Sequence, residues 1–199
     1  MSHYLIEFRF FGKAKREIKR LILEVDKKFS FGRRKRPVPH ISLAGPFETK
    51  NQRRLLSDFR SLCEKHNLMH FTVEGYGYFL LTRVIFINIK PDKEFDLFRW
   101  KLSKTLQLYC SLKPYDLKRK FEYHATIARN LPLLKFIAVK LYIDKKSKPN
   151  FKHALIRATL TRDSKILCEY DFLLKRLLNR REAKSRTLLK KTFRKLKQT

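Results

Sequence analysis

One pattern recurs along this chain at a nearly constant interval, and it limits the possible folds more than any other feature. His40 opens the apolar stretch HISLAGPF, and His124 opens HATIA 84 residues later. The stretches that begin near His70 and His153 lie 83 residues apart. Such an interval indicates an ancient duplication, and duplicated halves commonly pack about a pseudo-twofold axis. We therefore predict two repeats, about 1–82 and 83–174, that place His40 and His124 in one central cleft.

Each half alternates stretches typical of strands with stretches that have helical spacing. The first half predicts strands at 4–11, 40–47 and 70–80 and helices at 13–28 and 51–66. The second half predicts strands at 83–90, 121–128, 151–161 and 164–174 and helices at 92–110 and 133–146. This order predicts an α+β fold of two similar lobes.

The histidines are each followed two residues later by a hydroxyl, Ser42 after His40 and Thr126 after His124. Alternate residues of a strand project from one face, so each pair presents an imidazole beside a hydroxyl. With a pKa of about 6.5, one imidazole can take a proton from water while the other protonates a leaving oxygen. The hydroxyls can hold nonbridging phosphate oxygens. These four are the predicted catalytic residues of a phosphodiesterase that needs no metal or cofactor. The residues themselves leave open which histidine is the base.

His-x-Ser/Thr is a common pattern, and a third match at His70 serves as a control. His70 stands at the start of a predicted strand but has no such motif at the equivalent position of the other half. We interpret it as coincidental. The equivalent placement of His40 and His124 in two halves is what gives their motifs weight.

The segments PHISLAGPF and FEYHATIAR resemble the two-histidine phosphoesterase superfamily, in its 2′-5′ RNA ligase and cyclic phosphodiesterase branch. Both have the form His-x-Ser/Thr-apolar, and the resemblance spans about residues 3–174. Two positions differ, because Tyr123 stands where many relatives have proline and Ile127 where leucine is more usual. Neither difference removes a reacting group.

The resemblance implies a bilobal α+β fold with an antiparallel sheet and flanking helices in each lobe and a central cleft. It also implies hydrolysis of 2′,3′-cyclic phosphate ends of RNA to 2′-phosphates, with His124 as the base and His40 as the acid. Some relatives join RNA through a 2′-5′ bond, which is the same chemistry with a 5′-hydroxyl in place of water. The sequence does not choose between these directions.

The net charge favours a polyanionic partner, since 48 Lys and Arg against 18 Asp and Glu leave +30. Single-stranded RNA ends are the partner we expect. A basic run precedes each histidine motif and would place cations at the cleft rim, although solvated loops are the alternative. Arg129 matches the family's motif arginine, and Tyr123 is a candidate for stacking on a base unless it packs in the core. The predicted RNA-binding residues are Arg34, Arg36, Lys118, Lys120, Tyr123 and Arg129.

Residues 175–199 form a basic segment beyond the two-lobed domain of residues 1–174. Leu188, Leu189, Phe193 and Leu196 lie among Lys and Arg, which predicts a basic amphipathic helix. RNA binding, membrane-surface binding, docking on the body and disorder all remain open for it.

Two other functions compete with a phosphoesterase of RNA ends. A non-catalytic RNA-binding module would use the fold as a basic cradle, but the intact motif in both halves argues against it. A phosphodiesterase of small substrates such as ADP-ribose cyclic phosphate would not need so much positive charge. The apolar runs are too short to span a membrane, and three separated cysteines indicate neither disulfides nor a zinc site. We therefore expect a cytoplasmic monomer.

Overall fold

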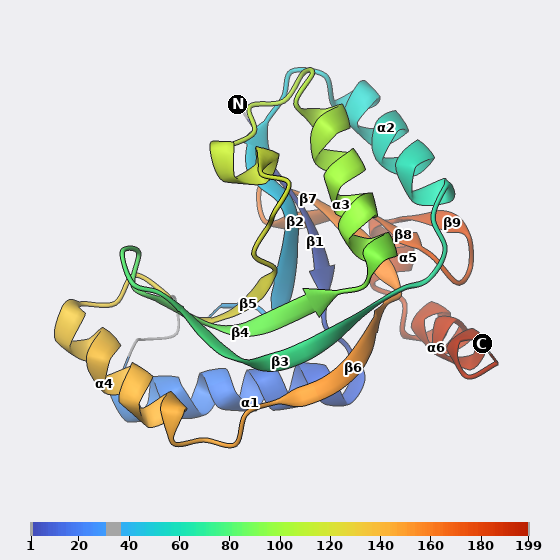
Figure 1. Ribbon diagram of the computed structural model, residues 1–199. Coiled ribbons are helices and arrows are strands. Elements are labelled where there is room, and N and C mark those ends of the chain that lie inside the picture. The colour runs from blue at the N-terminus through green and yellow to red at the C-terminus, as the bar shows by residue number, and fades with distance from the viewer. Residues whose placement is uncertain (1, 31–36, 199) are drawn as a thin grey trace.

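Two antiparallel sheets form the centre of the protein, and helices pack against them (Figure 1). The structure is a computed structural model that describes residues 2–30 and 37–198. Sheet A has the strand order β2-β1-β7-β8-β9, and sheet B has the order β5-β4-β3-β6. This arrangement confirms the predicted α+β fold with an antiparallel sheet in each of two lobes.

The strands of sheet A come from both ends of the chain. They are β1 (His3–Arg9), β2 (His40–Glu48), β7 (Arg157–Arg162), β8 (Lys165–Asp171) and β9 (Arg176–Asn179). The strands of sheet B are β3 (Met69–Phe79), β4 (Val84–Pro91), β5 (His124–Ala128) and β6 (Asn150–Leu155). Sheet B is therefore built from one continuous stretch of sequence.

The long helices lie on the faces of these sheets. The helices are α1 (Gly12–Phe29), α2 (Gln52–Glu64), α3 (Lys93–Leu106), α4 (Leu133–Asp144), α5 (Arg180–Ala183) and α6 (Arg186–Leu196), with a short 3-10 helix η2 (Pro114–Leu117). Helix α1 runs beneath sheet B, whereas α2 and α3 pack together on the other side of the molecule (Figure 1). Asn51 and Asp92 cap α2 and α3 by accepting hydrogen bonds from the backbone N–H groups of Arg54 and Phe95.

The two sheets do not follow the two halves of the sequence. Strand β3, from the first half, pairs with β4 in sheet B, whereas β7 and β8, from the second half, complete sheet A beside β1. The sequence analysis treated the stretches near His70 and His153 as equivalent, and this was wrong. They belong to β3 and β6, which pair with each other in sheet B. By position, β2-β1-β7 corresponds to β5-β4-β3. The equivalence of the two histidine strands, β2 and β5, holds in this correspondence.

The single strand predicted at 151–161 is two strands in different sheets. Residues up to Leu155 belong to β6 in sheet B, and Arg157 begins β7 in sheet A. Ile156 lies between them and is buried. Because nearly every residue here is buried or half-buried, its pattern of apolar residues gives no sign of the change of sheet.

The basic C-terminal segment is docked on the body. Strand β9 pairs with β8, so sheet A continues past residue 174. On α6, Thr192 is fully buried, and its hydroxyl donates to the Asp171 carboxylate at 2.6 Å and accepts from the Arg157 guanidinium at 2.9 Å. The Phe193 ring lies 5.1 Å from that of Phe11, at the start of α1. Of the alternatives left open for this segment, the structure favours docking over disorder.

In the part of the chain that the structure describes, none of the helices has the length and apolar character needed to cross a membrane.

Candidate active site

The two histidine motifs lie on equivalent edge strands, each with its polar side chains on one face. On β2, His40 and Ser42 are half-buried and alternate with the buried Ile41 and Leu43. On β5, His124 and Thr126 alternate in the same way with Ala125 and Ile127, which are fully buried. The apolar residues therefore hold each strand in the core while the imidazole and hydroxyl point away from it.

Both imidazole rings are held by the same hydrogen bond. Nδ1 of His40 lies 2.7 Å from the carbonyl oxygen of Val38, and Nδ1 of His124 lies 2.9 Å from that of Glu122. In each case the acceptor is two residues before the histidine. Because a carbonyl can only accept, Nδ1 carries a proton, and in the neutral ring Nε2 is the free base. Each histidine thus has its Nε2 available for proton transfer.

His124 lies in an apolar setting. The centroid of its ring is 5.1 Å from that of Phe79 and 5.0 Å from that of Phe86. Burial lowers the pKa of His124 below its ordinary value, the hydrogen bond to Glu122 opposes this, and the proximity of His40 lowers the pKa further. The neutral, basic form of His124 is therefore favoured, and the two histidines are close enough to interact.

His40 lies beside a buried carboxylate that the sequence analysis missed. Glu7 on β1 is 4% exposed, and its Oε2 lies 3.7 Å from Nε2 of His40. Its Oε1 accepts a hydrogen bond from Nε of Arg9 at 2.5 Å. Glu7 pairs across the strands with Ser42, whereas the residue across from Thr126 is Phe86. The signal was present in the sequence, because Glu7 and Arg9 lie two residues apart in an otherwise apolar strand.

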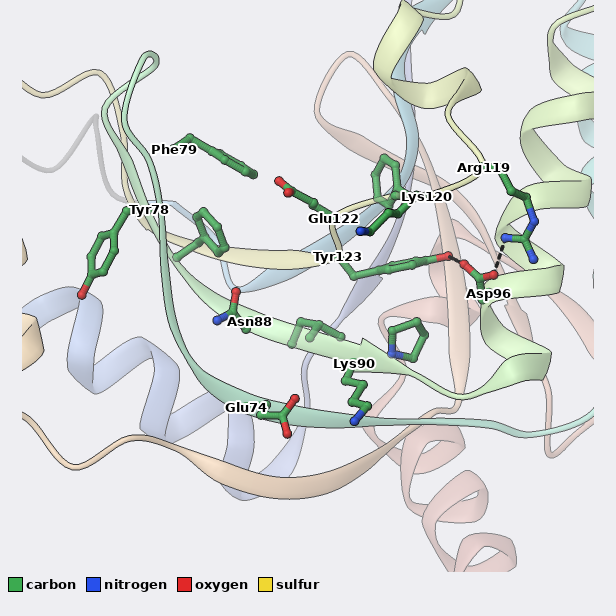
Figure 2. Close-up of a pocket in the computed structure, with 14 residues that line it drawn as sticks. Glu74, Tyr78, Phe79, Asn88, Lys90, Asp96, Arg119, Lys120, Glu122 and Tyr123 are labelled. Carbon is green, nitrogen blue, oxygen red and sulfur yellow. Dashed lines mark hydrogen bonds and ion pairs between the residues drawn. The ribbon is translucent and has the colours of Figure 1, made fainter.

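A pocket of about 800 Å³ opens on sheet B (Figure 2). Its lining includes the Phe79 and Phe86 rings that contact His124, but none of the four residues of the histidine motifs. Its floor includes Phe86 and Asn88 of β4, which pair across the strands with Thr126 and His124. Aromatic rings and a balanced set of charges line the rest. The remaining lining residues are Glu74, Tyr78, Phe79, Ile89, Lys90, Pro91, Asp96, Arg119, Lys120, Phe121, Glu122 and Tyr123.

Gly77 on β3 shapes this floor. A Cβ atom at Gly77 would collide with the Phe86 ring and lie 2.6 Å from Oδ1 of Asn88. The absence of a side chain therefore lets the Phe86 and Asn88 side chains lie across β3. The β3–β4 register shifts just before this position, between Val73 and Tyr76.

The predicted RNA-binding residues fall in different places. Lys120 and Tyr123 line the pocket, whereas Lys118 and Arg129 are exposed outside its lining. Arg34 and Arg36 lie outside the described residues. Tyr123 is buried, and its hydroxyl donates to Asp96 at 2.9 Å, so packing fixes the ring in the pocket wall. Asp96 also pairs with Arg119, as the dashed lines in Figure 2 show.

Arg99 on α3, a second residue that sequence reasoning missed, ties β2 to the segment before β5. It is fully buried, and its guanidinium donates to the backbone carbonyls of Leu43 at 3.3 Å, Lys118 at 3.0 Å and Asp116. Leu43 follows Ser42 directly. Arg99 therefore ties the strand that carries His40 to the segment that leads into the strand that carries His124.

The structure also bears on metal binding. Among residues 2–30 and 37–198, no three His, Cys, Asp or Glu side chains come together as a metal-ligand cluster.

Comparisons with known proteins agree on the family. A family model described as the 2′-5′ RNA ligase superfamily matches residues 12–165, which is most of the chain. The crystal structure of E. coli LigT complexed with 3′-AMP has a TM-score of 0.55 and 17% identity, over 85% of this chain and 97% of that one. A crystal structure described as a phosphoesterase has a TM-score of 0.51 and 14% identity, over 89% and 93%. At these identities the structures are similar in fold. The sequence has no significant match among curated proteins.

Proposed function

Because this chain belongs to the 2′-5′ RNA ligase superfamily of phosphoesterases, which act on phosphodiester bonds, we propose that it hydrolyses 2′,3′-cyclic phosphate ends of RNA to 2′-phosphates. The catalytic groups in this proposal are His40, Ser42, His124 and Thr126. The observation that carries it is the matched anchoring of the two imidazoles, each with Nδ1 on a backbone carbonyl and Nε2 available.

In the proposed reaction, Nε2 of His124 takes a proton from water as the water oxygen bonds to phosphorus. The bond from phosphorus to the ribose 3′-oxygen breaks, and protonated His40 gives its Nε2 proton to that oxygen. The products are a 2′-phosphate and a 3′-hydroxyl. Ser42 and Thr126 donate hydrogen bonds to the nonbridging phosphate oxygens. With a 5′-hydroxyl of RNA in place of water, the same groups would form a 2′-5′ bond.

The different surroundings of the two histidines support this division of roles. His124 lies against two neighbouring phenylalanine rings and has a lowered pKa, which suits a base that must be neutral before the reaction. His40 has the Glu7 carboxylate 3.7 Å from Nε2, and it forms an ion pair there when it is protonated. That placement suits an acid.

The pocket beside His124 supports a place for the nucleotide that carries the cyclic phosphate. Phe79, which is half-buried, offers aromatic surface for a base, and Lys120 offers a cation for a neighbouring phosphate. Lys118, Arg129, Arg34 and Arg36 would contact phosphates further along the RNA. The likeness to a LigT structure that holds 3′-AMP is consistent with a nucleotide ligand.

The direct test is incubation of purified protein with an oligoribonucleotide that ends in a 2′,3′-cyclic phosphate, in the presence of EDTA. We expect the cyclic end to gain one water and to comigrate with a 2′-phosphate standard and not with a 3′-phosphate standard. An unchanged cyclic end would contradict the proposal. If RNA then bound with steep salt dependence and its ends never changed, the protein would be a binding module.

The lowered pKa of His124 predicts the shape of the pH profile. A base must be neutral to accept a proton, and a lowered pKa keeps the ring neutral at more acidic pH. The acidic limb of kcat/KM should therefore have its midpoint below pH 6.5, the ordinary pKa of the ring. Rates of hydrolysis of a dinucleotide that ends in a 2′,3′-cyclic phosphate, measured between about pH 4.5 and 9, would give this midpoint. A midpoint at or above pH 6.5 would contradict His124 as the base.

A further inference from the structure

The large positive charge of the chain is not concentrated in the pocket. Three acidic residues of the lining, Glu74, Asp96 and Glu122, stand against three basic ones, Lys90, Arg119 and Lys120. The net charge of +30 must therefore act mainly elsewhere on the surface. Helix α1, with seven basic and three acidic residues, and helix α6, with five basic and no acidic residues, together carry +9 of it.

Helices α1 and α6 both turn a row of basic side chains to solvent. Residues three or four apart lie on one helix face, and the basic residues follow that spacing. On α1 the exposed ones include Lys15, Arg16, Lys19, Arg20, Lys27 and Lys28, and on and just after α6 they are Arg186, Lys190, Lys191, Arg194, Lys195 and Lys197. Helix α6 contains no acidic residue. On α2, Arg54 and Arg60 pair with acids of their own helix, as Lys13 does with Glu17 on α1.

The two basic rows are neighbours at one end, because α6 is fixed next to the start of α1. The Phe193 ring contacts the Phe11 ring, and the buried Thr192 is bound by Arg157 and Asp171 of sheet A. Figure 1 shows α6 beside the N-terminal end of α1. We call this the α1–α6 surface, defined by the exposed basic residues of these two helices.

We propose that the α1–α6 surface binds the phosphate backbone of RNA, at a place separate from the two histidines. Lys and Arg rows bind phosphates and release counterions, without reading the base sequence. Helix α1 lies on the opposite side of sheet B from the pocket (Figures 1 and 2). RNA bound on this surface leaves the cleft free. The enzyme can therefore hold the body of one RNA while it processes an end of that RNA or of another strand.

The packing of α6 favours RNA over a membrane as the partner. A basic amphipathic helix binds a lipid surface by inserting its apolar face. Here that face is turned inward, since Phe193 packs on Phe11, and Leu188 and Leu189 are at least partly covered. The outward face carries charge, which fits a polyphosphate that needs no apolar insertion.

The test compares two variants that lose the same charge. One replaces Lys15, Arg16, Lys190 and Arg194 by glutamine. The matched control replaces Arg53, Lys65, Lys101 and Lys104, four exposed basic residues of α2, α3 and the residue after α2. The probe is a fluorescent RNA hairpin of roughly 20 nucleotides with a 3′-hydroxyl, so that no cyclic end is present and binding is measured without catalysis.

We expect the first variant to bind this hairpin roughly 10- to 100-fold more weakly at about 100 mM salt. The slope of the logarithm of Kd against the logarithm of the salt concentration should be smaller by about 2 to 4. The control should change Kd by less than about threefold. Both variants should hydrolyse a dinucleotide that ends in a 2′,3′-cyclic phosphate at the wild-type rate. That result would also show that they fold. Equal weakening in both, or in neither, would overturn the proposal. Tight wild-type binding to phosphatidylserine vesicles that excess RNA does not displace would also overturn it. The binding test does not depend on the proposed catalytic function, because the hairpin carries no cyclic phosphate. It would give the same answer if the protein had no activity on cyclic ends.

Discussion

His124→Ala is expected to lower kcat for cyclic-end hydrolysis by about 10²- to 10⁴-fold, which is the usual contribution of a positioned acid or base. Without the imidazole, the attacking water has no proton acceptor in an otherwise apolar setting beside Phe79 and Phe86. His40→Ala should cause a loss of similar size, because the leaving oxygen then lacks its proton donor. The double variant should be little slower than the slower single one, since both groups act in the same step.

His70→Ala is the matched control for these variants. His70 has the same His-x-Thr pattern at the start of a strand, but it is exposed and lies on β3. Its removal should leave the turnover of cyclic ends unchanged, as measured by steady-state kinetics. A loss of less than about tenfold in both His40→Ala and His124→Ala would refute their assignment as catalytic groups.

Arg99→Leu is expected to lower the free energy of unfolding by about 3–5 kcal/mol, because three backbone carbonyls lose their donor and each buried unsatisfied group costs about 1–3 kcal/mol. The substitution would leave the carbonyls of Leu43, Lys118 and Asp116 without the donor that they share. It would also remove the cation that lies 3.8 Å from the centre of the Phe121 ring. Urea unfolding followed by circular dichroism would measure the change.

Lys101→Leu provides the comparison for Arg99, since it removes a cation from an exposed position of the same helix. Its effect on the free energy of unfolding should stay within about 0.5 kcal/mol. If the Arg99 variant were destabilised by no more than the Lys101 variant, the contacts of Arg99 would contribute little net stability. Burial lowers the pKa of Arg99, because the loss of solvent opposes its charge.

The sequence was sufficient to predict the local geometry of the candidate site. The two-residue period of a strand placed His40 and Ser42 on one face of β2, and His124 and Thr126 on one face of β5. The apolar residues that alternate with them lie in the core. These relations depend on neighbours in sequence, so the period of the strand reveals them.

Relations across strands could not be predicted in this way. That Glu7 would lie opposite Ser42, and Phe86 opposite Thr126, depends on register and sheet order. Tyr123 illustrates the same limit, because its partner Asp96 lies on α3. The sequence does not show that this helix packs there and fixes the Tyr123 ring in the pocket wall. The change from sheet B to sheet A at Ile156 falls within a run of residues that are buried in both sheets.

The origin of the two sheets has a consequence for how the protein acquires its structure during synthesis. Sheet B uses one continuous stretch, β3 to β6, so it can form as soon as that stretch has left the ribosome. Sheet A must bring β1 to β7, and the N–H of His3 donates to an Asp163 side chain 160 residues away along the chain. Contacts so distant in sequence carry a large loop-closure cost and form late. The lobe that carries His124 is thus expected to mature before the lobe that carries His40, and the two imidazoles come together only after β7 has been synthesised.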